Sequence, residues 1–405
     1  MSVPNLLLIV IDGWRASSLG AYGNSGLPTP NCDKLASESL LIDHLLCDSV
    51  ELPDFYDSLW NAKHSLQNHS DEYSILNRLA DKGYRTSLYT DEPWLAEAAT
   101  NLPLEQLSFL DLERTKAASS VAETSCGELF AIAGEQLAKS RGNDPRIAWI
   151  HARGFHGPWD APMEYRQQRL VEGDPPPLDF VTPPQFIESD DPDELFQYRT
   201  AYEAQMAVLD ECLGDFFAAA YSTIAESTLM VLAGSRGFAL GEHGTLGTDA
   251  RPLYGELLHV PCLLLAPNID QPIPRFSGLT QPMDLGATIC DSMQLDVDSA
   301  SKDGRSLLPM IANDADNWRQ WILSGSGSGS ESALRTPAWL MRTSEGTSEL
   351  FVKPDDRWES NEVANRCPEV LAAMQALQTQ LSKGEEAGIE LTEEEREMLL
   401  IGPNS

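Results

Sequence analysis

Apolar and polar positions alternate in two different ways along this chain. Five short apolar runs, each ending at polar residues or a glycine, have the length typical of buried strands. They cover residues 6–11, 86–89, 147–150, 229–232 and 262–265. Between them, residues 74–84, 121–140 and 193–220 have the apolar spacing of amphipathic helices. Strands alternating with helices from residue 6 to residue 265 predict an α/β fold, with a mostly parallel central sheet covered by helices on both faces.

Two segments interrupt this alternation. Residues 172–194 are rich in proline and acidic side chains and predict a long surface loop, whereas residues 324–330, SGSGSGS, predict a flexible connection. The segment that follows alternates, turns at Glu345 and Gly346, and precedes two helical patterns. We therefore expect an α/β/α domain over residues 1–322 and a small C-terminal α+β subdomain, a short antiparallel sheet plus helices, over residues 331–405.

Composition adds a strong charge imbalance to this pattern. Hydrophobic residues make up 42% of the chain, enough for a sizeable core, but 28 Lys and Arg face 62 Asp and Glu, a net charge of −34. Such a chain is not expected to bind nucleic acid or an anionic membrane through charge. Seven cysteines without a CxxC spacing, and a first apolar run that Asp12 closes, predict a cytoplasmic protein with reduced thiols, no signal peptide and no membrane helix. Whether it forms a homo-oligomer is left open.

Polar residues able to bind a ligand or to transfer a proton follow three of the predicted strands. The candidates are Asp12 after the first run, His151 and His156 after the third, and Ser235, Arg236 and His243 after the fourth. Because the carboxyl ends of parallel strands meet at one edge of a sheet, we expect these side chains to share a pocket. A strand-end carboxylate can hold a metal or cap a turn, and a neutral imidazole can donate to an oxyanion or shuttle a proton. A plain structural role for each histidine alone also fits.

The order of longer segments carries a family resemblance. PNLLLIVIDGWRASSLGAYGN and TPNCDKLASES are followed by HARGFHGPWDAP, and then by GFALGEHGTLG and LYGELLHVPCLLLAP. DGRSLLPMI and ELFVKPDDRWESNEVAN come later, in matching order. Over nearly its whole length the chain resembles the sulfatase family of the alkaline-phosphatase superfamily. That resemblance implies an alkaline-phosphatase-like α/β/α sandwich with a small C-terminal α+β subdomain.

The resemblance also implies a catalytic nucleophile, and here the sequence departs from the family. Family members carry a V-[C/S]-x-P-S-R signature, whose Cys or Ser is converted into formylglycine. The segment that aligns is SVELPDF, with Glu51 at the nucleophile position, Asp54 in place of the serine and Phe55 in place of the arginine. A glutamate cannot be converted, since the conversion starts from a thiol or hydroxyl on the β-carbon. Cys47 and Ser49 lie close by but out of register.

A calcium-type divalent cation is the second feature that the resemblance implies, and its ligands depart as well. The family usually has two aspartates where this chain has Asp12 and Gly13, and Asp with His or Asn where it has Ser235 and Arg236. A hard cation needs several oxygen ligands. We therefore expect no metal or other cofactor, Asp12 being the only retained candidate ligand; calcium or another divalent cation is expected only if the site is intact. Arg236 is predicted to fill the metal's place, paired with Asp12, Glu51 or both.

These departures favour a catalytically inactive member, a pseudoenzyme that binds a small molecule or a protein partner. In that interpretation His156, His243, Asp54 and His151 line a pocket without carrying out hydrolysis. One alternative is a sulfuric- or phosphoric-ester hydrolase with a rearranged site, in which Glu51 or Asp54 serves as base or nucleophile. A second alternative is a structural or assembly protein.

Overall fold

A mixed sheet forms the centre of the molecule. The computed structural model describes residues 4–66, 75–139, 145–224, 227–248, 252–267, 275–295, 303–311, 318–326, 329–383 and 389–401. Within these ranges nine strands form the sheet, in the order β10-β2-β11-β7-β1-β5-β3-β4 with β12 beside β2. They are β1 (Asn5–Ile11), β2 (Leu40–Leu46), β3 (Arg85–Thr90), β4 (Gln106–Phe109), β5 (Arg146–Ala152), β7 (Thr228–Gly234), β10 (His259–Val260), β11 (Cys262–Leu265) and β12 (Arg275–Thr280). Only β10 and β11 run against their neighbours, so the expected mostly parallel sheet is confirmed.

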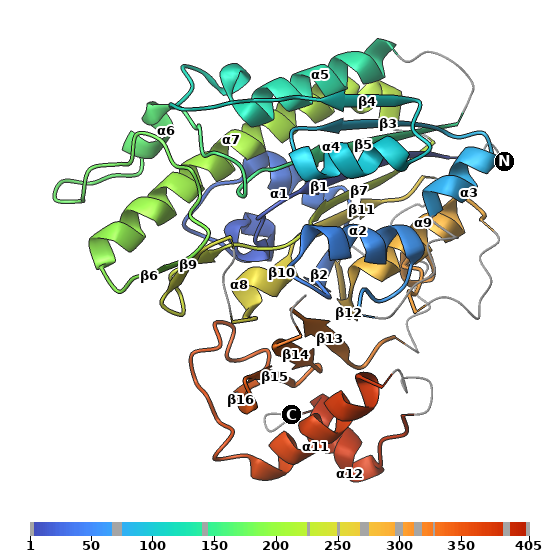
Figure 1. The fold of residues 1–405 in the computed structure, drawn as a ribbon, viewed down its shortest axis with the longest axis vertical. Coiled ribbons are helices and arrows are strands. Elements are labelled where there is room, and N and C mark those ends of the chain that lie inside the picture. Colours follow the sequence, from blue (N-terminus) through green and yellow to red (C-terminus); the bar gives the residue numbers. More distant parts are fainter. Residues whose placement is uncertain are drawn as a thin grey trace.

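Helices cover both faces of this sheet, because β1 is apolar at every position after Asn5. Its odd-numbered positions from Leu7 to Ile11 pack against one set of helices, and its even-numbered positions from Leu6 to Val10 against the other. The first set is α1 (Pro30–Ser37), α5 (Ser125–Lys139) and α7 (Pro192–Ile224). The second set is α2 (Leu52–Asn61), α3 (Ile75–Asp81), α4 (Pro93–Ala98) and α9 (Pro282–Ser292). Figure 1 shows α5 and α7 on one side of the strands and α2 and α9 on the other, which is the expected α/β/α sandwich.

Short elements lie around the edges of the sandwich. They are α6 (Met163–Gln167), α8 (Gly255–Leu258), α10 (Leu308–Ile311) and a three-stranded sheet of β6 (Ile187–Glu188), β8 (Ala239–Leu240) and β9 (Thr245–Gly247). The proline-rich segment 172–194 is therefore not loop throughout, because it contains β6 and the first turn of α7. Among the described helices, none combines the length and apolar character required to cross a membrane. The cytoplasmic location stays a prediction.

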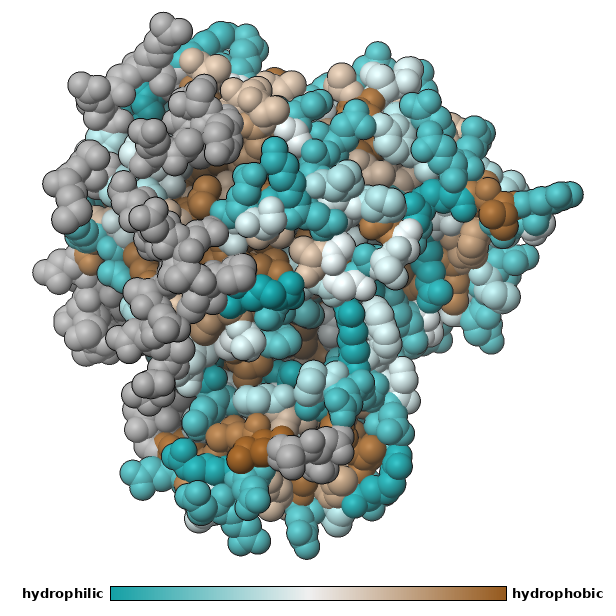
Figure 2. Space-filling model, turned by 180° about the vertical axis from the view of Figure 1, so that it is seen from behind, coloured by the Kyte–Doolittle hydropathy of each residue, from teal (hydrophilic) through white to brown (hydrophobic). Residues whose placement is uncertain are grey.

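The C-terminal part packs a second, antiparallel sheet against helices. Its elements are β13 (Ile322–Gly325), β14 (Glu331–Arg335), β15 (Trp339–Ser344), β16 (Thr347–Val352), α11 (Pro368–Leu381) and α12 (Glu393–Arg396), the last running into a π-helical turn over Glu397–Ile401. Leu334, Met341 and Leu350 of the sheet form a cluster with Met374 of α11. The expected turn is present between β15 and β16, where Glu345 has φ 48° and Gly346 φ 81°. Seen from behind, this part projects below the larger sandwich (Figure 2).

The predicted flexible connection over residues 324–330 is wrong in its first part. Ser324 and Gly325 belong to β13 and pair with β14. Ser324 also donates its hydroxyl to the Cys47 carbonyl at 2.6 Å, and the Gly325 amide donates to the Asp48 carbonyl at 2.9 Å. Small polar residues resemble a linker in composition, but here their lack of bulk lets β13 approach the end of β2 closely. Residues 327–328 lie outside the described residues, and the division of the chain at 322 and 331 stays a prediction.

Candidate active site

Three adjacent parallel strands carry the predicted site residues to one edge of the central sheet. Ile11, the last residue of β1, pairs with Ala152 of β5 on one side and Gly234 of β7 on the other. The next residues along the chain, Asp12 and Ser235 among them, therefore leave the sheet together. Asp12 is fully buried, and its amide donates to the Ala152 carbonyl at 2.9 Å. This edge is where open α/β sheets place ligands.

Arg236 holds the Asp12 carboxylate in a two-point contact. Arg236 Nε donates to Asp12 Oδ1 and Nη2 donates to Oδ2, each at 2.9 Å. The remaining nitrogen, Nη1, donates to the Val50 carbonyl at 2.9 Å, and the Ser235 hydroxyl donates to Asp12 Oδ1 at 2.7 Å. Parallel bonds of this kind fix both groups and are stronger than neutral hydrogen bonds. The prediction that Arg236 pairs with Asp12 agrees with this geometry.

The electrostatics of the pair follow from its burial. Burial alone raises the pKa of Asp12, but the charge and hydrogen bonds of Arg236 outweigh it and hold that pKa well below its usual range. Burial alone lowers the pKa of Arg236, and Asp12 in turn raises it above its ordinary value. Both groups are therefore charged at neutral pH. The side chain of Arg236 keeps 18% exposure while that of Asp12 keeps 1%, so the ion pair closes over the carboxylate.

Gly13 shows why no second carboxylate stands beside Asp12. Its φ is 73°, in the left-handed region, and a Cβ at this position would lie 2.6 Å from His156 Cδ2 and 2.8 Å from Phe155 Cβ. The space that a side chain at position 13 needs is thus filled by Phe155 and His156, in the loop after β5.

Two histidines lie beside or beneath the ion pair in neutral form. Burial lowers the pKa of His156 to about 4, helped by the Arg236 charge, and its Nε2 donates to the Gly237 carbonyl at 3.2 Å. His156 Nδ1 lies 3.6 Å from Asp12 Oδ2. Burial likewise lowers the pKa of His151 to about 4, and its Nδ1 contacts the Tyr56 hydroxyl at 2.7 Å. Both imidazoles are neutral at pH 7 and do not replace the cation that Arg236 supplies.

The segment at the nucleophile position stands next to the pair but does not enter it. Glu51 is the N-cap of α2 and is exposed, and its carboxylate makes no hydrogen bond or ion pair within the described ranges. Asp54, in the first turn of α2, makes none there either. Cys47 is fully buried, donates Sγ–H to the Ser235 carbonyl at 2.9 Å, and has a thiol pKa that burial raises well above its ordinary value. The out-of-register cysteine is thus an inert thiol under the site.

His243 belongs to a different cluster. Its ring stacks on Tyr254 with centroids 3.6 Å apart, Nδ1 contacts Glu256 Oε1 at 2.7 Å, and Nε2 lies 3.3 Å from the Glu359 carbonyl. Burial lowers the pKa of His243, but Glu256 more than offsets this, so the pKa is raised overall. The expectation that His243 joins Asp12 fails on these contacts, because the loop after β7 carries it toward the C-terminal part.

Sequence patterns missed an acidic pair that follows β3. Asp91 is buried and accepts a hydrogen bond from the Arg153 amide at 2.8 Å, while Glu92 lies 3.2 Å from Arg153 Nε. Burial raises the pKa of Asp91 to about 7. The signal that could have identified them is the one used for Asp12, a carboxylate directly after a buried strand. Glu92 and Arg236 interact electrostatically, which places this pair at the margin of the same site.

The donor set around Asp12 does not fit a hard divalent cation. Calcium takes six to eight oxygen ligands, and its carboxylate ligands need free lone pairs. Both oxygens of Asp12 already accept from Arg236, position 13 has no room for a carboxylate, and Ser235 points its hydroxyl proton at Asp12. Elsewhere in the described part of the chain, no cluster of three or more His, Cys, Asp or Glu side chains could hold a metal.

Comparison with known proteins agrees with the fold and with the family resemblance. A family model described as Sulfatase matches residues 4–295. The structure is similar to that of the phosphonate monoester hydrolase of Agrobacterium radiobacter, with a TM-score of 0.75 and 18% identity over 96% of this chain and 98% of that one. It is also similar to a 2-O GAG sulfatase, with a TM-score of 0.74 and 16% identity over 96% of this chain and 94% of that one.

A human protein shares a shorter segment. Arylsulfatase D from Homo sapiens is 37% identical over 83 residues, which are 20% of this chain and 12% of that protein. The match therefore spans a small fraction of arylsulfatase D. Because the family model covers most of the chain and the fold agrees from end to end, this protein belongs to the sulfatase family of the alkaline-phosphatase superfamily.

Proposed function

We propose that this chain is a sulfatase-family pseudoenzyme, which keeps the fold, binds a ligand or partner and does not hydrolyse esters. The observation that carries the proposal is the two-point contact of Arg236 with Asp12. It commits the one retained candidate metal ligand to a guanidinium. The structural neighbours include hydrolases, but identities of 16% and 18% concern the fold alone.

The chemistry of ester cleavage supports the same proposal. Hydrolysis needs a nucleophile at the reacting atom and positive charge aimed at the oxygens that become more negative in the transition state. Glu51 stands at the nucleophile position but carries a negative charge that repels an approaching sulfate or phosphate. The nearby guanidinium of Arg236 is neutralised by Asp12, and both histidines beside it are uncharged at pH 7. Neither requirement is met by the residues around Asp12.

An ester screen tests the proposal. The chain, co-expressed with a formylglycine-generating enzyme and supplied with calcium, is assayed against an aryl sulfate, an aryl phosphate and a phosphonate monoester. We expect turnover no higher than that of the heat-inactivated protein. Turnover above that level that is lost in Glu51→Gln or Asp54→Asn would overturn the proposal in favour of a hydrolase with a rearranged site. Turnover that is lost in Cys47→Ala would overturn it in favour of an intact nucleophile in a shifted register.

A further inference from the structure

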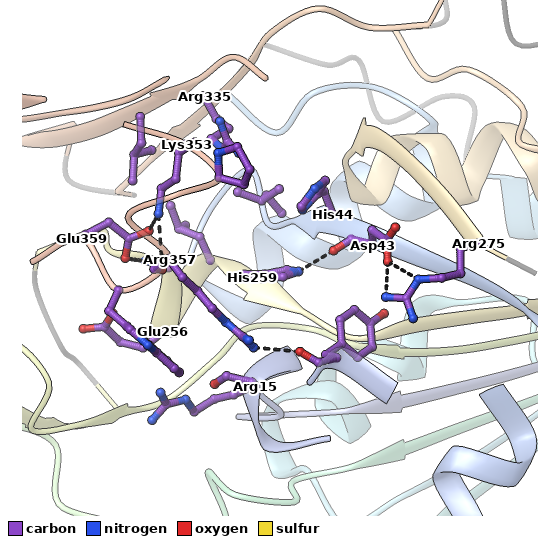
Figure 3. A pocket seen from close by; sticks show the side chains of 18 residues that line it. Arg15, Asp43, His44, Glu256, His259, Arg275, Arg335, Lys353, Arg357 and Glu359 are labelled. Carbon is purple, nitrogen blue, oxygen red and sulfur yellow. Dashed lines mark hydrogen bonds and ion pairs between the residues drawn. The ribbon is translucent and has the colours of Figure 1, made fainter. Parts of the chain in front are cut away.

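A cavity separate from the Asp12 site lies between the sandwich and the C-terminal sheet. Its volume is about 330 Å³, within the range of small-ligand pockets. Its walls come from the turns after β1, from β2, α8 and β12, and from β14, β15 and the loop after β16. Figure 3 shows charged side chains from these elements converging on it. Arg236 and Asp12 do not line it.

Positive charge gathers around this cavity although the chain as a whole carries −34. Five cationic side chains line it against three carboxylates. Three of the cations are neutralised by an adjacent carboxylate, in the pairs Arg15–Glu242, Arg275–Asp43 and Lys353–Glu359. The third lining carboxylate, Glu256, is bonded to His243, whose pKa is raised.

Arg335 and Arg357 are the two lining cations outside these three ion pairs. Neither makes an ion pair with a carboxylate within the described residues. Arg335 is 7% exposed and donates to the carbonyls of Thr336 and Trp339, so its hydrogen bonds are to neutral groups. Burial lowers its pKa to about 10, although the Glu359 carboxylate acts in the opposite direction, and Arg335 is therefore charged at pH 7. Arg357 stands at the mouth, where it donates to the Tyr22 carbonyl at 2.8 Å.

Two half-buried imidazoles line the cavity beside the cations. Burial, together with the charges of Arg335 and Lys353, lowers the pKa of His44 to about 4. Burial lowers the pKa of His259 to about 3, and its Nε2 contacts the Asp43 carbonyl at 2.7 Å. Both rings are neutral at pH 7, so they neither add to the excess charge nor cancel it.

The remaining wall is apolar. Leu46, Leu258, Leu340 and Pro354 line the cavity beside the charged groups, and the Trp358 side chain at the rim is 50% exposed. A buried cation without a counter-charge is costly, and an incoming anion removes that cost. Guanidinium groups recognise oxyanions through paired hydrogen bonds. The volume exceeds what a bare oxyanion fills, and the leucines offer a surface for an organic group.

We propose that this cavity binds a small organic dianion of the phosphate-monoester class, attracted by the charges of Arg335 and Arg357, with its organic part against the apolar wall. Arg335 and Arg357 carry two positive charges without an ion-paired carboxylate among the described residues, and a phosphate monoester carries close to two negative charges at pH 7. A sulfate ester, with one charge, leaves one cation unmatched. The proposal does not depend on whether the Asp12 site is inactive, since the two sites share no lining residue that the argument uses.

Isothermal titration with phenyl phosphate tests the proposal, with phenyl sulfate as the monoanionic comparison. We expect one site for phenyl phosphate, at least about tenfold weaker binding of phenyl sulfate, and about tenfold or greater loss of phenyl phosphate affinity in Arg357→Gln, which removes charged hydrogen bonds at an exposed position. Arg335→Gln is expected to act in the same direction, with circular dichroism as the check on its fold.

Two matched variants locate the binding. Arg85→Gln removes an exposed arginine on β3, and Glu51→Gln removes a charge beside the Asp12 site. Both are expected to bind phenyl phosphate as the unmodified chain does. Absence of phenyl phosphate binding at millimolar concentration, equal binding of phenyl sulfate, or binding that Glu51→Gln changes and Arg357→Gln does not would each overturn the proposal.

Discussion

Replacing Arg236 by methionine is expected to lower the free energy of unfolding by about 3–5 kcal/mol. The substitution keeps most of the side-chain volume but leaves the Asp12 carboxylate buried with only the Ser235 hydroxyl and the Gly13 amide as donors to its oxygens. Removing one partner of a buried ion pair lowers the free energy of unfolding strongly, because the other charge stays buried without a partner. Replacing both partners by apolar residues has a much smaller effect. The nearby imidazoles do not replace the cation, since His156 and His151 have pKa values of about 4.

Urea unfolding followed by tryptophan fluorescence measures this loss. Arg85→Met is the matched control, because Arg85 is half exposed in its pair with Glu105 and its loss is expected to cost less than about 1 kcal/mol. The double variant Asp12→Asn/Arg236→Met is expected to recover part of the loss, since it removes the stranded charge. A midpoint for Arg236→Met equal to that of Arg85→Met would show that Arg236 does not hold Asp12.

The destabilisation by Arg236→Met is expected to grow as the pH rises from 4 to 7. In the unmodified chain the pKa of Asp12 is held far below its unfolded value of about 3.9, so its stabilising contribution is complete above that value and is lost only as the pH falls below it. Without Arg236, burial raises the pKa of Asp12 instead. A raised acid pKa gives stability at low pH that disappears as the pH rises through it. Between the pKa of Asp12 in the folded unmodified chain and its pKa in folded Arg236→Met, the difference in free energy of unfolding between the two proteins grows by about 1.4 kcal/mol per pH unit.

Unfolding curves at pH 4, 5, 6 and 7 measure the gap between Arg236→Met and the unmodified chain. The other titratable groups facing Asp12, notably His156 and His151, are present in both Arg236→Met and Asp12→Asn/Arg236→Met. The double variant therefore separates the contribution of these histidines from that of Asp12. The difference in free energy of unfolding between the double variant and the unmodified chain is expected to depend less on pH. A gap for Arg236→Met that stays constant from pH 4 to pH 7 would mean that Asp12 does not carry a buried charge.

Sequence patterns predicted the strands that are largely buried on both faces. They missed strands in which buried positions alternate with, or are interrupted by, half-buried or exposed ones. β1 is apolar from Leu6 to Ile11 and is visible as a strand without any other information. β2 contains Asp43 and His44, half-buried against the C-terminal part, which interrupt its apolar run. β4 alternates between half-buried and exposed positions at the edge of the sheet. Such strands are recognisable only once their neighbours in space are known.

The Asp12–Arg236 pair was predictable because the family resemblance places both residues at the metal site. A lone strand-end carboxylate and an arginine in the loop after a neighbouring strand meet wherever the two strands are adjacent. His243 was misplaced because it lies eight positions after Ser235, and the path of the chain between them depends on tertiary contacts of His243 with Glu256 and Tyr254. The basic cavity was not predictable, since Arg335 and Arg357 come from strands and loops with no pattern that marks a site.

The content of tightly bound calcium measures whether the Arg236 guanidinium occupies the place where other family members hold their metal. The chain is purified in calcium, dialysed against calcium-free buffer and analysed by inductively coupled plasma mass spectrometry beside Asp12→Asn treated in parallel. We expect both proteins to retain the same small fraction of an equivalent of calcium, which raised salt displaces from both, as expected for weak binding to an acidic surface. One equivalent of calcium per chain that survives dialysis and is absent from Asp12→Asn would contradict this expectation.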